Sequence, residues 1–401
     1  DVTDSNATAP KVLWEFTDAN DKDMGFSYGQ ATIVRVSSTD EWVALIPNGY
    51  NNSQNDYPDP TDPRNQIGDG SAVLYVVRLS DGQLLAKLDT DVGTPATPNG
   101  MATAVAVDSS QIAGGVDLGA DYAYAGDVYG NLWRFDFRSS SYTVWESSIE
   151  NVFKPDTDLI RPITLKPRVM FLPTGDVNND KDSVVMFATG KYIELPDRST
   201  NIEDQYVVGI YDGIDIDRSD PDDAVSILDP DYVEQVLSES ARVRNLTNKQ
   251  VDFNDSDLIG WKIKLITKGE RINSPLELLG QQILLVASTI PKGEDPCESG
   301  GLGWIMAIDP LTGATPVIGE IFDVEVNALD IDGNPITVLV SGTGILVNDP
   351  PVGGISILES QGGGTASIII EGSTDTTIID LEKFSWRRRN WSNLLLSLIH
   401  I

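Results

Sequence analysis

The pattern of apolar and polar positions between Asp121 and Phe137 predicts a β-hairpin. Apolar residues alternate over Tyr122–Ala125 and again over Leu132–Phe137, and Gly, Asp and Asn residues separate the two runs. An alternation with a period of two, interrupted by residues that favour turns, is typical of antiparallel strands joined by a short connection. We therefore expect two paired strands in this stretch.

The end of this hairpin recurs along the chain. The segment Gly130–Asp136 has a close copy in Gly303–Asp309 and a looser one in Leu74–Arg78. The last residues of these segments are separated by 58 and 173 positions, and 173 is close to three times 58. A repeat of this length in a chain of 401 residues predicts about seven units, and repeated small sheets are typical of β-propeller blades. We therefore predict an all-β fold, a β-propeller of seven blades, with a pair of non-propeller β-sandwiches as the alternative.

Three local predictions complete this interpretation. Val73–Leu79 and Gln83–Leu88 flank a turn and predict a second hairpin, and Tyr142–Trp145 is expected to close a unit as a strand. Asp229–Arg244 has apolar residues at helical spacing and predicts one minor helix. We expect modified blades with long loops, divided as a flexible lead-in over residues 1–10, a propeller over 11–386 and an atypical tail over 387–401. The tail is basic and then apolar, unlike the acidic body, which favours a frameshift or a cloning scar, with a native membrane-seeking segment as the alternative.

Composition excludes several classes of function. The chain has 61 acidic and 28 basic residues and a net charge of −33, so binding to nucleic acid is not expected, because phosphates attract Lys and Arg. Cys297 is the only cysteine and His400 the only histidine, which excludes an internal disulfide, Cys/His metal sites and a Ser-His-Asp triad in the body. No apolar run reaches the roughly 20 residues that span a bilayer. The first residues lack the features of a signal peptide, so we expect any such peptide to have been removed or to lie upstream.

One acidic loop has the spacing of a calcium site. Asp176, Asn178 and Asp180 supply oxygen ligands at positions 1, 3 and 5, and Asp182 can add a carbonyl or carboxylate oxygen at position 7. The loop departs from the usual pattern at Lys181, which replaces a glycine, and it has no glutamate at position 12. The sequence therefore predicts a Ca²⁺ site here, and a solvated acidic turn is the alternative.

A series of motifs, in a fixed order over residues 12 to about 315, resembles the C-terminal domain of PilC/PilY-type proteins, the tip-associated adhesins of bacterial type IV pili. These motifs are Leu13–Thr17, Tyr28–Gln30, Asn48–Tyr50, Pro98–Gly100, Asp121–Phe137, Met186–Glu194, Gly260–Trp261, Gly269–Arg271, Glu294–Cys297 and Gly303–Trp304. The resemblance implies a seven-bladed propeller at the end of a longer secreted chain. Since the N-terminal region of such proteins is absent, we interpret this chain as a fragment.

The resemblance also implies a function and a second, weaker metal site. Members often carry a calcium loop before the matching hairpin, and here Asp108, Asp117 and Asp121 remain of it, without the intervening carboxylates. The implied function is a non-enzymatic, calcium-tuned binding and regulatory module that supports pilus biogenesis, twitching motility and attachment to surfaces or host cells. The implied partners are minor pilins, the N-terminal region of the full-length adhesin and a host or surface ligand.

The implied location is the extracellular or outer-membrane surface, at the fimbrium, after export through the periplasm. The strand ends also allow an alternative function. Similar strand ends occur in quinone-binding propellers, which use Ca²⁺ and a quinone for oxidation. Dye reduction in the presence of pyrroloquinoline quinone and an alcohol would separate the two functions.

Overall fold

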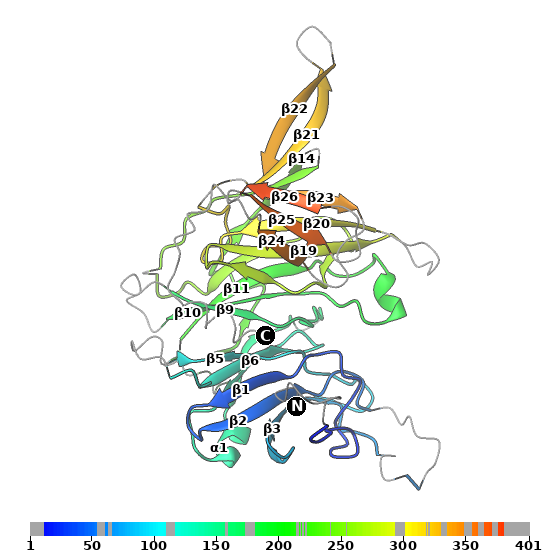
Figure 1. Ribbon diagram of the computed structural model, residues 1–401, viewed down its shortest axis with the longest axis vertical. Coiled ribbons are helices and arrows are strands. Elements are labelled where there is room, and N and C mark those ends of the chain that lie inside the picture. The colour runs from blue at the N-terminus through cyan, green and yellow to red at the C-terminus, as the bar shows by residue number, and fades with distance from the viewer. Residues whose placement is uncertain are drawn as a thin grey trace, which may run out of the picture.

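The described part of the chain is folded into successive β-sheets. The computed structural model describes residues 12–53, 61–62, 66–109, 117–156, 159–172, 181–213, 216, 218, 220, 223–240, 242–253, 255–292, 301–317, 319, 321–329, 335–348, 355–359, 365–370 and 376–380. Figure 1 shows the sheets following one another along the long axis in chain order, from β1 at the bottom to β19 and β20 near the top.

Four sheets are built largely from consecutive antiparallel strands. The first has the order β1-β2-β3-β4 and comprises β1 (Thr32–Val36), β2 (Glu41–Pro47), β3 (Ser71–Arg78) and β4 (Leu84–Gly93). The second has the order β12-β8-β7-β6-β5 and comprises β5 (Val105–Val107), β6 (Tyr122–Gly126), β7 (Leu132–Asp136), β8 (Ile149–Lys154) and β12 (Val225–Ser226).

The third has the order β13-β16-β11-β10-β9 and comprises β9 (Arg168–Phe171), β10 (Ser183–Ala188), β11 (Tyr206–Asp212), β13 (Tyr232–Gln235) and β16 (Gly260–Lys264). The fourth has the order β14-β15-β23-β20-β19-β17, with β18 also paired to β19. It comprises β14 (Leu237–Ser240), β15 (Val243–Leu246), β17 (Arg271–Ile272), β18 (Glu277–Leu279), β19 (Ile283–Pro291), β20 (Gly301–Ile308) and β23 (Gly344–Asn348).

The remaining described elements are few. A hairpin projects at the top of Figure 1 and consists of β21 (Phe322–Leu329) and β22 (Pro335–Gly342). A three-stranded sheet consists of β24 (Ile355–Glu359), β25 (Thr365–Ile370) and β26 (Thr376–Asp380), and the helices are α1 (Tyr142–Ser147) and the 3₁₀ helix η2 (Leu195–Arg198). These described sheets do not confirm a count of seven blades. Within the described part of the chain, no helix is long and apolar enough to cross a membrane.

The strands of the inner sheets are buried on both faces. Along β10, Val184 and Met186 pack toward the fourth sheet, whereas Val185 and Phe187 pack toward the second. This follows from the alternation of side chains across a strand. It explains why the strand reads as a continuous apolar run, since a sheet that is covered on both faces has no polar side.

The predicted hairpins are confirmed. β6 and β7 pair antiparallel, with Tyr122 opposite Asp136 and Gly126 opposite Leu132. β3 and β4 pair in the same way around the predicted turn. Asp127 and Asp136 cap turns, because each carboxylate accepts a nearby backbone N–H.

Two of the three recurring strand ends, those at Arg78 and Asp309, share a turn. Gly82 follows β3 and Gly313 follows β20, with φ values of +74° and +68°. Each amide donates to the carbonyl four residues earlier, at 2.9 Å in both turns. The indole N–H of Trp14 and that of Trp261 donate to the carbonyl three residues before the respective glycine, at 2.8 and 3.2 Å. A tryptophan from a distant segment therefore closes each turn.

The predicted helix over Asp229–Arg244 is wrong. The chain between β11 and β16 instead forms short strands that extend three different sheets. β12 pairs with β8 of the second sheet, β13 with β16 of the third, and β15 with β23 of the fourth, carrying β14 beside it. Sheet edges offer unpaired N–H and C=O groups, and satisfying them outweighed a weak helical pattern.

The predicted strand over Tyr142–Trp145 is also wrong, because this segment forms helix α1. The Trp145 ring is fully buried. It packs edge-on against Phe137, with 5.2 Å between ring centroids, and against Tyr142 at 4.9 Å. The helical turn places this ring in a hydrophobic cluster formed by side chains of the first two sheets. Burial of the indole therefore decides the local structure.

Candidate functional site

Most of the predicted calcium loop lies outside the described residues. Of the predicted ligands, Asp182 is described, and the others lie outside the described residues, namely Asp176, Asn178 and Asp180. The backbone of Asp182 donates to Asp212 O at 3.0 Å and accepts from Leu172 N at 2.9 Å. This last bond brings Leu172 and Asp182 together, where β9 ends and β10 begins.

Lys181, which replaces a glycine of the usual calcium loop, points its ammonium group at the 255–258 segment. Its Nζ donates to the carbonyl oxygen of Ser256 at 3.0 Å and to that of Leu258. Burial lowers the pKa of this lysine. Backbone carbonyls of a neighbouring segment therefore hold Lys181 in place.

The weaker candidate site occupies the equivalent connection of the second sheet, between β5 and β6. The Asp108 carboxylate accepts Leu118 N at 3.1 Å, Asp117 accepts Gly119 N at 2.7 Å, and Asp121 accepts Ser109 N at 3.0 Å. These carboxylates thus stabilise turns of their own loop. Over the described ranges, no three acidic, histidine or cysteine side chains are grouped to hold a metal. Calcium binding by either loop remains a prediction.

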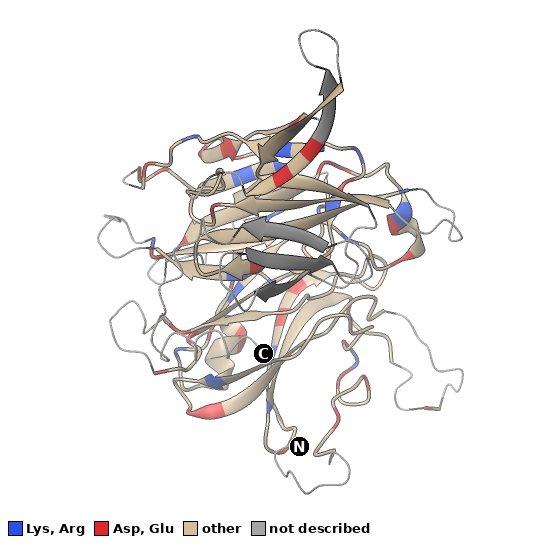
Figure 2. Ribbon diagram, turned by 45° about the horizontal axis from the view of Figure 1, so that its top comes forward, with Lys and Arg blue, Asp and Glu red and all other residues tan. Residues whose placement is uncertain are grey.

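The acidic surplus is not gathered in these loops alone. Figure 2 shows acidic and basic residues interspersed along loops and strand ends of the described chain. The charge therefore gives no guide to a single site, and individual groups have to be considered by their contacts.

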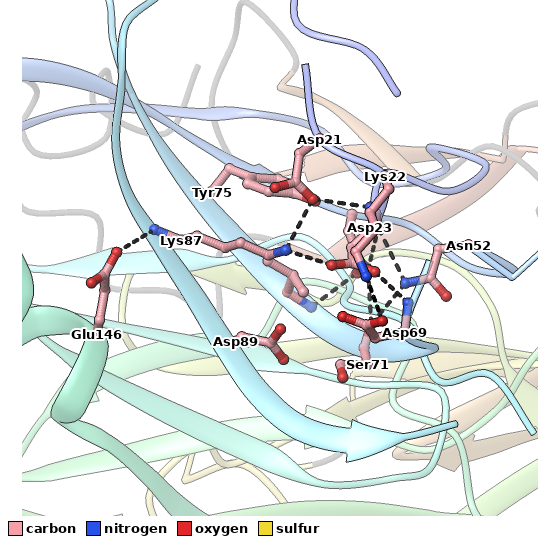
Figure 3. Close-up of polar contacts among 12 residues, drawn as sticks. Asp21, Lys22, Asp23, Asn52, Asp69, Ser71, Tyr75, Lys87, Asp89 and Glu146 are labelled. Carbon is pink, nitrogen blue, oxygen red and sulfur yellow. Dashed lines mark hydrogen bonds and ion pairs between the residues drawn. The ribbon is translucent and has the colours of Figure 1, made fainter. Parts of the chain in front are cut away.

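A charged cluster in the first sheet was not predicted from the sequence. Figure 3 shows Lys87 of β4 extending its ammonium group toward Asp21 and Asp23, which precede β1. Nζ lies 3.0 Å from Asp21 Oδ1 and also pairs with the fully buried Asp23. Tyr75 donates its hydroxyl to Asp21 at 3.0 Å, and Asp69 N donates to Asp23. The Lys87 ammonium group thus lies between two carboxylates and pairs with both.

The pKa shifts in this cluster have a common cause. Burial by itself opposes both charges, but the hydrogen bonds and charges of the partners outweigh it, so the pKa of Asp21 is lowered and the pKa of Lys87 is raised. Asp89, two residues after Lys87 in β4, behaves differently, because burial raises its pKa. The sequence offers only the triplet Asp21-Lys22-Asp23 as a signal, because Lys87 lies 64 positions away from Asp23.

Asp127 forms a second buried polar centre, at the end of β6. Its carboxylate accepts four N–H groups, two from Asn131 and one each from Asn99 and Trp133, at 2.8 to 2.9 Å. Burial nevertheless raises its pKa. This carboxylate ties the β6–β7 turn to the segment that enters the second sheet, so its role is to position the backbone.

Buried ion pairs also stabilise contacts between elements. Arg134 of β7 pairs with Asp212 at the end of β11, at 3.2 Å, and so joins the second and third sheets. Arg244 of β15 makes a two-point pair with Glu270, at 2.6 and 2.9 Å, and stacks 4.0 Å from the centre of a Trp304 ring. Both arginines are buried. These arrangements support the fold and do not resemble a catalytic centre.

Comparisons with known proteins relate these features to a family. The family model described as PilY1 beta-propeller domain matches residues 1–249. The chain is 27% identical over 405 residues to the type IV pilus biogenesis factor PilY1 of Pseudomonas aeruginosa, an alignment that covers 90% of this chain and 32% of that protein. It is 25% identical over 348 residues to a PilY1 homolog of Xylella fastidiosa, covering 80% of this chain and 21% of that protein. The chain thus spans a third or less of the length of these relatives.

A solved structure agrees with the predicted architecture. The crystal structure of the Pseudomonas aeruginosa PilY1 C-terminal domain matches with a TM-score of 0.66 at 22% identity, over 92% of this chain and 76% of that chain. The predicted β-propeller class is therefore confirmed. Since the family model covers more than half of the chain, this protein belongs to the PilY1 beta-propeller domain family.

Proposed function

We propose that this domain is a calcium-tuned binding and regulatory module of a type IV pilus-associated adhesin. Family membership carries the proposal, because the relatives named above are type IV pilus biogenesis factors. The fold suits such a role, since a stack of sheets presents many surface connections on a scaffold of paired strands.

The calcium part rests on the spacing in the Asp176–Asp182 loop and on its closed ends at Leu172 and Asp182. Asp176, Asn178, Asp180 and Asp182 would hold the ion through oxygen atoms, the ligands that Ca²⁺ prefers. Bound calcium would neutralise carboxylates that otherwise repel one another in a protein of net charge −33. Binding to the folded state alone stabilises it, by about 2.7 kcal/mol at a free concentration of one hundred times Kd.

The proposed partners follow from the pilus role. They are minor pilins, the N-terminal region of the longer adhesin, and a host or surface ligand. The proposed location is the cell surface at the fimbrium, after export through the periplasm. In this setting the domain would support pilus biogenesis, twitching motility and attachment.

Metal analysis and melting curves test the calcium part. Purified protein should retain calcium after gel filtration, and a chelator should lower its Tm. Asp180→Ala should abolish the response to chelator. Glu234→Ala, which removes an exposed carboxylate of β13, is the control for lost charge and should keep the response. A wild-type Tm that is indifferent to chelator would refute calcium tuning and leave the pilus role intact.

A genetic test addresses the pilus role. The domain carrying Asp180→Ala, Glu234→Ala or no change would replace its counterpart in a full-length adhesin, and surface pili and twitching zones would be measured. Fewer pili or smaller zones are expected for Asp180→Ala alone. Normal piliation and motility after deletion of the whole domain would contradict the proposal. Quinone-dependent dye reduction with an alcohol should be absent, and its presence would favour the oxidoreductase alternative.

A further inference from the structure

The hairpin of β21 and β22 projects from the body of the molecule (Figure 1). Its strands pair antiparallel at eight positions, from Phe322 opposite Gly342 to Leu329 opposite Pro335. Over the part of the chain that the structure describes, neither strand pairs with a third one. At about 3.4 Å per residue the hairpin is about 27 Å long, and a two-stranded ribbon is marginally stable unless another element adds to it.

The fourth sheet holds the base of this hairpin and lies beside β22. Phe322 is fully buried in a hydrophobic cluster with side chains of β19 and β20. At the end of β22, a Cβ added to Gly342 would lie 2.8 Å from Arg244 O of β15, and Thr343 N donates to the same carbonyl at 2.9 Å. β22 also begins with Pro335, which has no backbone N–H. The edge of β21 is therefore the better one for a partner, because the N–H and C=O groups of a sheet edge can pair with another strand.

The two faces of the hairpin differ in chemistry. Asp323 and Glu325 of β21 are exposed, and Figure 2 shows acidic positions on the projecting hairpin. The register places Glu325 opposite Leu339 on one face. Because side chains alternate across a strand, Val324 belongs to the other face, where it lies opposite Val340. β21 and β22 contain no basic residue, so an added strand would meet carboxylates on one face and aliphatic side chains on the other.

These features indicate the chemistry of the occupant. When a peptide adds to a sheet edge, main-chain hydrogen bonds supply affinity and alternate side chains supply specificity. A segment with alternating basic and apolar residues would place its cations beside Asp323 and Glu325 and its apolar side chains beside Val324. We propose that β21 is the docking edge for such an extended segment of a partner polypeptide, which adds to the hairpin as a third strand.

A second copy of this chain fits the hairpin poorly. Each copy has a net charge of −33, and two hairpins side by side would bring like carboxylates together, which is destabilising. A ribbon of this size has a face of about 300 Å², well below the roughly 800 Å² that each partner of a stable interface buries. The inference adds a partner chemistry to the proposed binding role, on which it rests, and it does not depend on calcium.

Binding of blocked, fluorescein-labelled octapeptides to the full chain tests the inference by fluorescence anisotropy. One peptide consists of Lys-Val repeats, a Glu-Val peptide reverses the charge, and a Lys-Pro peptide keeps the charge but lacks every second backbone N–H. The Lys-Val peptide should saturate and bind about tenfold more tightly than either control, because each control loses one of the two interactions. Hydrogen exchange should show added protection in β21 and none in β9 or β14, which are edges of other sheets.

A charge reversal tests the acidic face. Glu325→Lys should weaken binding of the Lys-Val peptide about tenfold. Glu15→Lys makes the same change at an exposed residue before the first sheet and should leave binding unchanged. Melting curves check that both variants fold.

Three results would overturn the inference. They are failure of the Lys-Val peptide to saturate, equal binding of either control peptide, and protection of another sheet edge instead of β21. An equal effect of Glu325→Lys and Glu15→Lys would also overturn it, since binding would then follow net charge alone. These assays contain no pilus component, so their failure would leave the pilus role to the genetic test.

Discussion

The turn at Gly313 provides a sharp test of the packing between sheets. Its φ of +68° lies in the left-handed region, and an added Cβ would lie 2.5 Å from Trp261 Cε3. Gly313→Ala therefore incurs two costs. The left-handed conformation costs an L-residue about 1–2 kcal/mol, and forcing an extra carbon into a packed site costs about 1–3 kcal/mol. The expected loss in the free energy of unfolding is about 2–5 kcal/mol.

Gly280 is a matched control for the first cost. Its φ is +53°, and an added Cβ would meet nothing within 4 Å. Gly280→Ala should therefore lose only about 1–2 kcal/mol. Urea unfolding followed by far-UV circular dichroism measures both variants, and the difference between them gives the cost of the contact with Trp261.

A double-mutant cycle isolates this contact. In a Trp261→Leu background the overlap is relieved, so the extra cost of Gly313→Ala over Gly280→Ala should fall toward zero. Equal losses for Gly313→Ala and Gly280→Ala in the wild-type background would refute the packing argument. An extra cost that persists without the indole would also refute it.

Three further predictions concern buried charges. The pKa of Asp21 is lowered, so its contribution to stability is present above its ordinary pKa near 3.8 and is lost as the pH falls through its pKa in the folded state. The pKa of Lys87 is raised, so its contribution is present below its ordinary pKa near 10.5 and is lost as the pH rises through its pKa in the folded state. Lys87→Met should lower the Tm at pH 7 and weaken both pH dependences, and unchanged profiles would contradict an ion pair. Asp127→Asn should cost about 2 kcal/mol in urea unfolding, because the new NH₂ group faces N–H donors, and a neutral result would show that those donors find other acceptors. Glu270→Gln should cost about 3–5 kcal/mol, because it removes the buried charge that pairs with the buried Arg244 and leaves only the exposed carboxylate of Glu239, 3.4 Å away. Glu239→Gln should cost little.

The local strand pattern was readable because it depends on near neighbours. The β6–β7 hairpin follows from alternation and turn residues within a few positions. Asp127 and Asp136 cap turns through backbone groups two to four residues away. The interpretation of Asp229–Arg244 failed because β13 and β15, two short strands there, pair with strands that belong to other parts of the chain. The sequence of a short strand does not show which distant strand it will pair with.

The candidate sites also differ in whether their signals are local or long-range in the sequence. The spacing of Asp176–Asp182 is a local signal, so the sequence can propose a calcium loop without the fold. The ion pairs of Lys87 with Asp21 and Asp23 had no such signal, because the two sides lie more than 60 positions apart.

The sequence by itself determined the all-β class, the main hairpins, the recurring strand ends and the family. Each of these is encoded in short patterns or in their order. Only the tertiary structure decided that Trp14 and Trp261 close equivalent turns, and that one connection extends three sheet edges. The physical reason is that burial and hydrogen-bond satisfaction depend on which segments meet in space, and many different partners can satisfy the same local pattern.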